Sequence, residues 1–190
     1  MRTISYAQAI REALAEEMER DEQVFVLGED VGESGGVFGV TKGLIGRFGA
    51  ERVLDTPISE EAIVGAAVGA SLLGGRAVVE IMFSDFAMLA MDQIVNQAAK
   101  THYMTGGRLS APVTIRLVTG TAGATAAQHS QSLEAWFVHA PGLKCVAPST
   151  PGDAKGLLKA AVRDPDPVCF FEHKLLYNTK GEVPDEVERL

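Results

Sequence analysis

Two adjacent carboxylates, Glu60 and Glu61, follow a turn that the sequence marks clearly. Pro57 fits neither a helix interior nor a central strand, so the chain must turn just before them. Ser59 is a favourable N-cap, and acids in the first helical turn interact well with the helix dipole. The pair is therefore either a simple helix start or a start from which one carboxyl group, able to donate and accept a proton, reaches into a cleft. Position favours the cleft, because ligands of open α/β sheets bind beyond the carboxyl ends of strands.

A further acid and a histidine also lie where a ligand can approach. Glu29 comes directly after the apolar strand expected over 24–27. The acidic, glycine-rich segment 29–36 lacks the spacing of a phosphate-binding loop, and its charges would repel a diphosphate. His129 follows the small-residue loop 119–124, which permits close approach of a ligand, although a packing histidine fits the same spacing.

Other reactive patterns are missing from the sequence. A serine hydrolase built on Ser130 or Ser132 near His129 is not expected, because no GxSxG elbow surrounds either serine. The four histidines show neither HExxH nor the paired spacing of zinc sites. Cys145 and Cys169 lie in apolar segments without CxxC spacing, which favours the reduced, packed thiols of a cytoplasmic protein.

The composition is that of a single globular domain. The 190 residues are 46% hydrophobic, which is enough for a sizeable core. The net charge of -8 argues against nucleic acid or an anionic membrane as a partner, since clustered cations bind both. Neither a secretory signal nor a transmembrane span is predicted.

Apolar runs of strand length alternate with segments of helical periodicity. The predicted strands cover 24–27, a run ending near 55, 77–82, 113–118, 144–147 and 168–171. The predicted helices cover 5–20, 41–48, 62–73, 84–104, 133–138 and 150–162. This alternation predicts an α/β fold with a doubly wound, mostly parallel sheet of about six strands and helices on both faces.

The helix that follows Ser59 carries a face of small residues. Gly65 and Gly69 are four residues apart and so lie on one side, although each costs about 1 kcal/mol relative to alanine. We expect a close helix–helix contact at this face, either inside the domain or across a subunit interface.

Seven longer motifs occur along the chain: DTPISE (55–60), FSDF (83–86), DQIVNQAAK (92–100), YMTGG (103–107), AQHSQSL (127–133), PGLK (141–144) and DAKGL (153–157). In this order they resemble the beta subunits of thiamine-diphosphate-dependent 2-oxo acid dehydrogenases, which include the pyruvate, branched-chain and acetoin enzymes. The resemblance extends from Ile4 to Pro184. It implies that residues 1–180 form a pyrimidine-binding, transketolase-like domain.

The resemblance implies a role for each candidate residue. Glu60 matches the glutamate that hydrogen-bonds N1′ of the thiamine aminopyrimidine, where sharing a proton helps to activate the thiazolium carbon. Phe86 matches the aromatic ring that packs on the pyrimidine. His129 matches the histidine that faces the reaction centre and serves proton handling or acyl transfer to lipoyl groups. Glu29 matches an acid of the polar tunnel that connects paired active sites. The further residues expected to contact the cofactor are Ile58 and Gln128.

Some members of the family hold a structural potassium ion, mainly through backbone oxygens. The matching positions here are Val113, Ala161, Val162, Asp164 and Asp166. Asp166 stands where the family usually has asparagine, and it follows a proline, so the sequence departs from the pattern at this site.

The resemblance also implies partners. The family's diphosphate- and magnesium-binding motif, GDG followed by an asparagine, belongs to the alpha subunit and is missing here. The expected complex contains that alpha subunit, a second beta subunit and a lipoyl acyltransferase, and it oxidatively decarboxylates a 2-oxo acid, with pyruvate as the expected substrate. The family's C-terminal transketolase domain is also missing and 181–190 is expected to be a linker or tail, so we expect either a fragment or a naturally split subunit.

Two alternatives are compatible with the same motifs. One is a subunit of acetoin dehydrogenase or of another transketolase-type thiamine enzyme. The other is a non-catalytic interaction module that keeps the fold. The presence of Glu60, Phe86 and His129 favours an enzyme.

Overall fold

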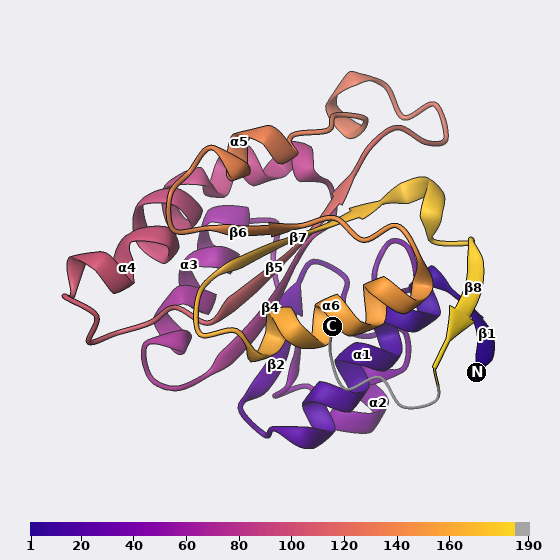
Figure 1. Ribbon diagram of the computed structural model, residues 1–190, viewed down its shortest axis with the longest axis horizontal. Coiled ribbons are helices and arrows are strands. Elements are labelled where there is room, and N and C mark those ends of the chain that lie inside the picture. The colour runs from indigo at the N-terminus through magenta and orange to yellow at the C-terminus, as the bar shows by residue number, and fades with distance from the viewer. Residues whose placement is uncertain (185–190) are drawn as a thin grey trace.

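The computed structural model describes residues 1–184 and contains a six-stranded sheet with the order β3-β2-β4-β5-β7-β6 (Figure 1). Its strands are β2 (Val24–Gly28), β3 (Val53–Asp55), β4 (Arg76–Ile81), β5 (Val113–Thr119), β6 (Lys144–Val146) and β7 (Val168–His173). All neighbouring strands in this sheet run parallel. The predicted α/β fold with about six strands is confirmed.

Helices cover both faces of this sheet. They are α1 (Tyr6–Arg20), α2 (Leu44–Phe48), α3 (Glu60–Ser71), α4 (Ala99–Met104), α5 (Glu134–Val138) and α6 (Pro151–Arg163). The chain also forms the 3-10 helices η1 (Ser84–Ala90), η3 (Ala127–His129) and η4 (Lys174–Leu176), and the π-helix η2 (Asp92–Ala98). Within the described residues, none of the helices combines the length and hydrophobicity needed to cross a bilayer.

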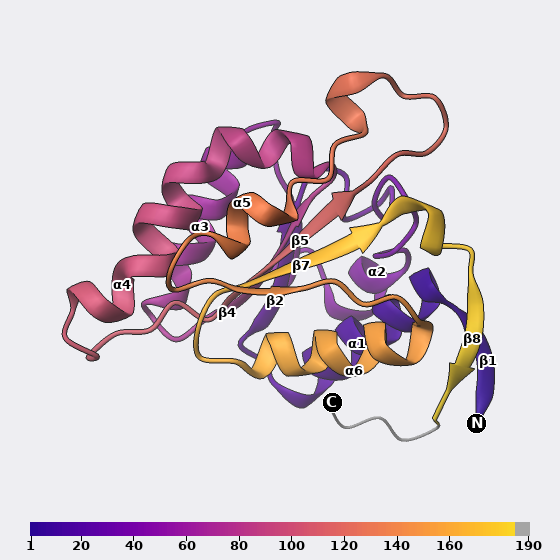
Figure 2. The same ribbon diagram turned by 45° about the horizontal axis from the view of Figure 1, so that its top comes forward.

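Two hydrophobic clusters sandwich the sheet. One includes Leu14 of α1 and Leu158 of α6, and the other includes Val64 of α3 and Phe137 of α5. Figure 2 shows α1 and α6 on one side of the sheet and α3, α4 and α5 on the other. β5 lies between the two layers with every residue buried, as expected for a parallel strand that is covered on both faces.

Side-chain caps fix the starts of the two longest helices. The Ser5 hydroxyl accepts a hydrogen bond from the Gln8 amide at 3.2 Å, and the Thr150 hydroxyl accepts one from the Asp153 amide at 3.1 Å. Pro151 occupies the first turn of α6, where its missing N–H costs nothing. These starts agree with the sequence prediction.

Three predicted helices differ in detail. Segment 84–104 was expected as one helix but consists of η1, η2 and α4, and side-chain hydrogen bonds from Asn96 and Gln97 to Asp92 accompany the wider π turn. The helix expected from 41 begins only at Leu44, because Gly43 adopts a left-handed conformation with φ +84°. Ser59 takes the N-cap position of α3, but its φ and ψ of -168° and 73° give no side-chain capping bond.

A second, two-stranded sheet lies apart from the main one. β1 (Arg2–Ser5) and β8 (Lys180–Val183) pair antiparallel. The linker or tail predicted for 181–190 is therefore wrong at its beginning, because residues 181–183 belong to β8, and residues 185–190 lie outside the described chain. The pairing follows from Ile4 and Val183, which are buried together with Ala9.

A buried ion-pair network spans the centre of the main sheet. Arg116 on β5 is fully buried and donates Nε and Nη2 to the two carboxylate oxygens of Glu172 on β7, at 2.6 and 2.8 Å. Its Nη1 donates to Glu80 on β4, and the Tyr177 hydroxyl donates to Glu172 at 2.8 Å. Burial raises the pKa of Glu80, and the charge of Arg116 opposes that rise. Two buried carboxylates thus depend on one guanidinium.

Candidate functional site

The carboxyl ends of the parallel strands share one edge of the sheet. β2 connects to β3 on one side, whereas β4 lies on the other side of β2 and leads on to β5, so the topology switches between β2 and β4. Ligands of open α/β sheets bind in the crevice at such a switch point. The segments that follow β2, β3, β4 and β5 at this edge carry the predicted site residues Glu29, Glu60, Phe86 and His129.

Glu60 and Glu29 form an acidic pair at this switch-point edge. Glu60 is the first residue of α3 and is 6% exposed, and Glu29 directly follows β2 and is 8% exposed. Burial and the Glu60 carboxylate raise the pKa of Glu29, while a hydrogen bond from the Ser59 backbone opposes the rise. The lack of a side chain at Gly28 permits the close approach of β2 to β4 here, because a Cβ at this position would lie 2.7 Å from the Glu80 carbonyl oxygen. A carboxyl group with a raised pKa beside a second carboxylate suits proton exchange with a bound base.

Glu61 lies in different surroundings from Glu60. It is exposed and lines a surface groove of about 340 Å³ together with Ala62, Gly65 and Gln93. The structure therefore separates two carboxylates that helix-start chemistry treats alike, because Glu60 is buried at the switch-point edge and Glu61 is exposed.

Ile58 and Gln128 were predicted to contact a cofactor. Ile58 is 82% exposed in the turn before α3, and Gln128 is exposed in η3. Both lie at the switch-point edge, and their contact with a ligand stays a prediction.

Three buried side-chain oxygens lack a hydrogen-bond partner within residues 1–184. They are Glu29 Oε1, Thr56 Oγ1 and Asp85 Oδ2, and they follow β2, β3 and β4, respectively. Buried polar atoms are normally paired, and an unpaired one costs free energy. Their grouping at one sheet edge indicates that this edge accommodates a polar ligand or a polar partner group.

Phe83, Phe86 and His129 form an aromatic cluster at the same edge. The His129 ring meets Phe83 and Phe86 edge to face, with ring centroids 4.7 and 5.2 Å apart, and the two phenylalanines are 5.6 Å apart. η1, which carries Phe86, packs against α3, which begins at Glu60. Phe86 and His129 therefore pack together at the edge where α3 begins.

The positions predicted for potassium lie at the opposite edge of the sheet. The Arg76 guanidinium donates to the Val162 carbonyl at 3.0 Å, and the Asp164 amide donates to the Ala161 carbonyl at 3.2 Å. The Lys144 ammonium donates to both Asp164 oxygens at 2.7 and 2.8 Å and to Asp166 at 3.1 Å. The remaining predicted position, Val113, begins β5. Protein cations and amides thus bind the Ala161 and Val162 carbonyls and the carboxylates of Asp164 and Asp166, and potassium binding here stays a prediction.

No three His, Cys, Asp or Glu side chains in the described part of the chain are grouped closely enough to hold a metal ion.

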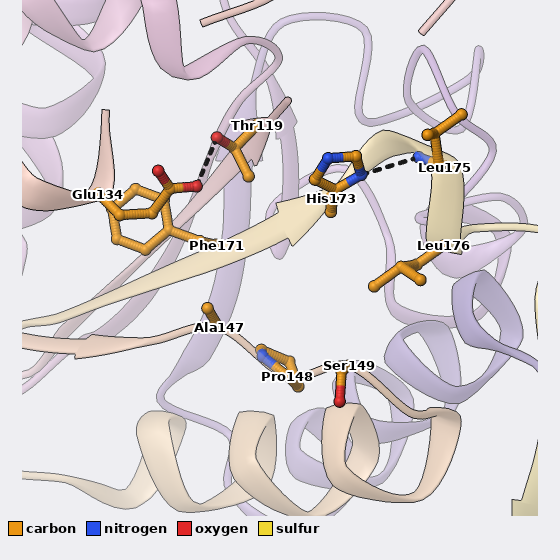
Figure 3. Close-up of a pocket in the computed structure, with 9 residues that line it drawn as sticks. All are labelled: Thr119, Glu134, Ala147, Pro148, Ser149, Phe171, His173, Leu175 and Leu176. Atoms are coloured by element: carbon orange, nitrogen blue, oxygen red, sulfur yellow. Dashed lines mark hydrogen bonds between the residues drawn. The ribbon is translucent and has the colours of Figure 1, made fainter. Parts of the chain in front are cut away.

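A cavity of about 420 Å³ opens beside the strand ends of β5, β6 and β7 (Figure 3). Its walls are mostly apolar, and its polar groups bond within the chain: the Thr119 hydroxyl donates to Glu134 at 2.8 Å, and His173 Nδ1 accepts from the Leu175 amide at 3.3 Å. None of the unpaired oxygens described above belongs to its lining. We therefore place the candidate site at the acidic pair.

At Gly65 the small-residue face of α3 meets η2, whereas at Gly69 it is open within the described chain. A Cβ at Gly69 would meet no atom within 4 Å, and one at Gly65 would meet only the Gln93 side chain, at an ordinary contact distance of 3.5 Å. Packing of η2 against α3 inside the domain therefore accounts for part of this face, and a subunit interface, the other predicted explanation, stays a prediction.

Sequence reasoning missed several residues of this edge. They are Thr56, Phe83, Asp85 and Lys174, each of which lies within a few positions of a strand end. The signal that could have found them is the one that found Glu29, namely a polar or aromatic residue directly after an apolar strand.

Comparisons with known proteins agree with this fold. Residues 2–180 match the family described as "Transketolase, pyrimidine binding domain". The pyruvate dehydrogenase E1 component subunit beta of Rhizobium meliloti is 54% identical over 184 residues, covering 97% of this chain and 40% of that protein. The 2-oxoisovalerate dehydrogenase subunit beta of Bacillus subtilis is 56% identical over 185 residues, covering 97% and 57%.

A third relative, the acetoin:2,6-dichlorophenolindophenol oxidoreductase subunit beta of Cupriavidus necator, is 54% identical over 194 residues, covering 97% of this chain and 57% of that protein. The chain therefore spans 40% to 57% of the length of these relatives. A solved structure described as a split gene transketolase, inactive beta4 tetramer, aligns with a TM-score of 0.75 at 21% identity, over 98% of this chain and 56% of that one. The family match covers both the parallel sheet and its switch-point edge, so the chain belongs to the family of transketolase pyrimidine-binding domains.

Proposed function

We propose that this chain is the pyrimidine-binding part of the beta subunit of a thiamine-diphosphate-dependent 2-oxo acid dehydrogenase. The observation that carries the proposal is the burial of Glu60 beside Glu29 at the switch-point edge. Relatives with the names of such subunits are 54% and 56% identical to this chain. Together these observations favour an enzyme over a non-catalytic module.

Glu60 binds the pyrimidine ring in this proposal. Its carboxyl group exchanges a proton with ring N1′ from a buried position beside Glu29. The unpaired oxygens of Glu29 and Thr56 provide acceptors for the polar groups of an aminopyrimidine. Phe86 offers an apolar ring that orients a flat ligand through its face. When bound, thiamine diphosphate supplies the carbon nucleophile that attacks the 2-oxo acid.

The other half of the cofactor belongs to a partner. No GDG motif occurs in this chain, and the acidic segment 29–36 would repel a diphosphate. An alpha subunit would therefore hold the diphosphate and its magnesium ion, and a lipoyl acyltransferase would accept the acyl group. We propose pyruvate as the substrate. Acetoin is the second candidate, because a relative named for acetoin is as similar to this chain, at 54%, as one named for pyruvate.

Titration calorimetry tests the division of the cofactor between two subunits. We expect this chain alone to bind thiamine diphosphate weakly and without dependence on magnesium, and to be inactive. Addition of the alpha subunit should produce tight, magnesium-dependent binding together with decarboxylation of pyruvate. Tight, magnesium-dependent binding to this chain alone would contradict the proposal.

A second beta subunit is proposed to cover the open face of α3. The substitution Gly65→Leu places a bulky side chain where two helices would touch, and overpacking of a close contact typically costs about 1–3 kcal/mol. We expect a smaller species in size-exclusion chromatography with a near-native circular dichroism spectrum. Lys180→Leu, at an exposed position of β8, is the matched control and should leave the assembly unchanged. An unchanged oligomer in Gly65→Leu would count against the interface.

A further inference from the structure

The loop that carries His129 is closed at its base. It leaves β5 at Gly120 and returns at Gln131, where the Gly120 amide donates to the Gln131 carbonyl at 3.1 Å. Gly120 has a φ of +81°, and a Cβ there would lie 2.2 Å from His173 Nε2, so only glycine fits this position. Beyond this base most of the loop is exposed, and Ala126 adopts a φ of 64°, which is unfavourable for a residue with a side chain.

Asp85 holds one side of the loop base. It lies in η1 after β4 and is 6% exposed. Its Oδ1 accepts two hydrogen bonds from Gln131, one from the backbone amide at 3.2 Å and one from the side-chain Nε2 at 2.8 Å. The neighbouring Ser84 hydroxyl donates to the Gln131 carbonyl at 3.3 Å. Bonds to an ionised carboxylate are stronger than those between neutral groups.

Lys174 holds the other side, from a different strand. It follows β7, is 7% exposed, and its ammonium group donates to the backbone carbonyl of His129. The same ammonium lies 4.8 Å from the ring centroid of Phe83, which in turn packs on the His129 ring. Burial lowers the pKa of Lys174, and the Asp85 carboxylate opposes that shift, which indicates that the two charges attract each other.

We propose that Asp85 and Lys174 are positioning residues that together hold His129 in its working place. They lie in the segments that follow β4 and β7, the two neighbours of β5 in the sheet, so they hold the segment after β5 from both sides. Neither is a member of the acidic pair. The inference rests on the proposed function of His129, but the geometry of the clamp stands independently of it.

The structure of the loop explains why such a clamp is needed. The aromatic contacts orient the His129 ring, but the exposed loop has no other buried charged anchor among the hydrogen bonds of the described chain. Backbone displacement at His129 would misplace the imidazole, and a misplacement of about 1 Å can cost about 10²-fold in rate. Both anchors are buried and charged, so removing one leaves its partner groups unsatisfied.

Hydrogen–deuterium exchange tests the clamp without reference to catalysis. In the assembled alpha–beta protein we expect Asp85→Asn and Lys174→Met to speed amide exchange across 120–131, while exchange in β4 and β5 stays protected. Lys180→Met, at an exposed site, should leave the loop unchanged. Lys174→Arg keeps the charge and a donor and should restore much of the protection. Unchanged exchange in both clamp variants would overturn the proposal.

Kinetics then test whether the clamp acts through His129. We expect Lys174→Met to slow acylation of a lipoyl group by about 10–100-fold, the loss that misplacement of a reacting group produces. Proton exchange at the cofactor C2, which depends on Glu60, should stay within about twofold of the parent, because no group of the acidic pair is changed. The double variant with His129→Ala should be no slower than His129→Ala alone, since a positioning residue has no effect once the group that it positions is gone.

The outcomes separate the two proposals. Additive losses in the double variant would overturn the positioning role. Absence of C2 proton exchange in the assembled parent protein would instead contradict the proposed function, and the exchange measurement on the loop would still decide whether the clamp exists.

Discussion

Replacing Glu60 by glutamine should slow proton exchange at C2 of bound thiamine diphosphate by roughly 10²–10⁴-fold, the range typical for loss of a general acid or base. Glutamine keeps the shape and a hydrogen bond but cannot exchange a proton with the pyrimidine N1′. The cofactor should still bind in the reconstituted alpha–beta protein, because Phe86 and the partner's diphosphate site are unchanged. Nuclear magnetic resonance of quenched samples measures the exchange rate, and calorimetry measures the binding.

Glu61→Gln is the matched control for this change. Glu61 lies one position further along and about 100° around α3, and it is exposed in the surface groove beside Gly65. An exposed first-turn carboxylate contributes only about 0.3–1 kcal/mol through the helix dipole, so C2 exchange should hardly change. Near-normal exchange in Glu60→Gln, or a larger loss in Glu61→Gln, would reject the assignment of Glu60.

Replacing Arg116 by methionine should lower the free energy of unfolding by about 3–5 kcal/mol, the usual cost of removing one partner of a buried ion pair. The buried carboxylates of Glu80 and Glu172 would lose their common cation. Without the opposing charge of Arg116, burial would hold the pKa of Glu80 in the folded variant above its value in the unfolded chain. The loss of stability should be full at pH values above this folded-state pKa. It should shrink as the pH falls through that pKa, because the folded variant then binds more protons than the unfolded chain. Urea unfolding at mildly alkaline and mildly acidic pH measures both effects.

Arg47→Met is the control variant, because it removes an arginine from the surface instead of from the buried network. Arg47 pairs with Glu19 on the surface, where the two side chains are 50% and 52% exposed. Exposed pairs contribute about 0–1 kcal/mol, so this variant should unfold almost like the parent. Equal losses of unfolding free energy in the two variants would show that the contribution of Arg116 to stability does not depend on its burial.

The sheet could be predicted from the sequence because its signals are local. The apolar runs before Gly28 and after Pro112 are bounded by residues that stop strands, and the caps at Ser5 and Thr150 mark helix starts. The π-helix η2 could not be predicted, because an α-helix and a π-helix bury similar residues and differ only in hydrogen-bond register. β8 was missed because its only partner, β1, lies at the other end of the sequence.

The candidate site was predictable only in part for a similar reason. Glu29 and Glu60 each follow an apolar strand, so position alone made them candidates, and the resemblance to a family separated Glu60 from Glu61. Asp85 and Lys174 also lie near strand ends, but their role could not be predicted, since each acts on a loop more than forty residues away along the chain. The sequence cannot show which distant segments meet, because that depends on the order of strands in the sheet.

The pairing of β1 with β8 gives the domain a mechanical property. Arg2 stands opposite Val183 and Ser5 opposite Lys180, so both chain ends leave the ladder at the same end. Tension applied between the two ends would load the outermost hydrogen bonds first and open the ladder one rung after another, as in a zipper. The six-stranded sheet would carry the load only after this two-stranded ladder had opened, so the first yielding of the domain under force would leave the main sheet intact.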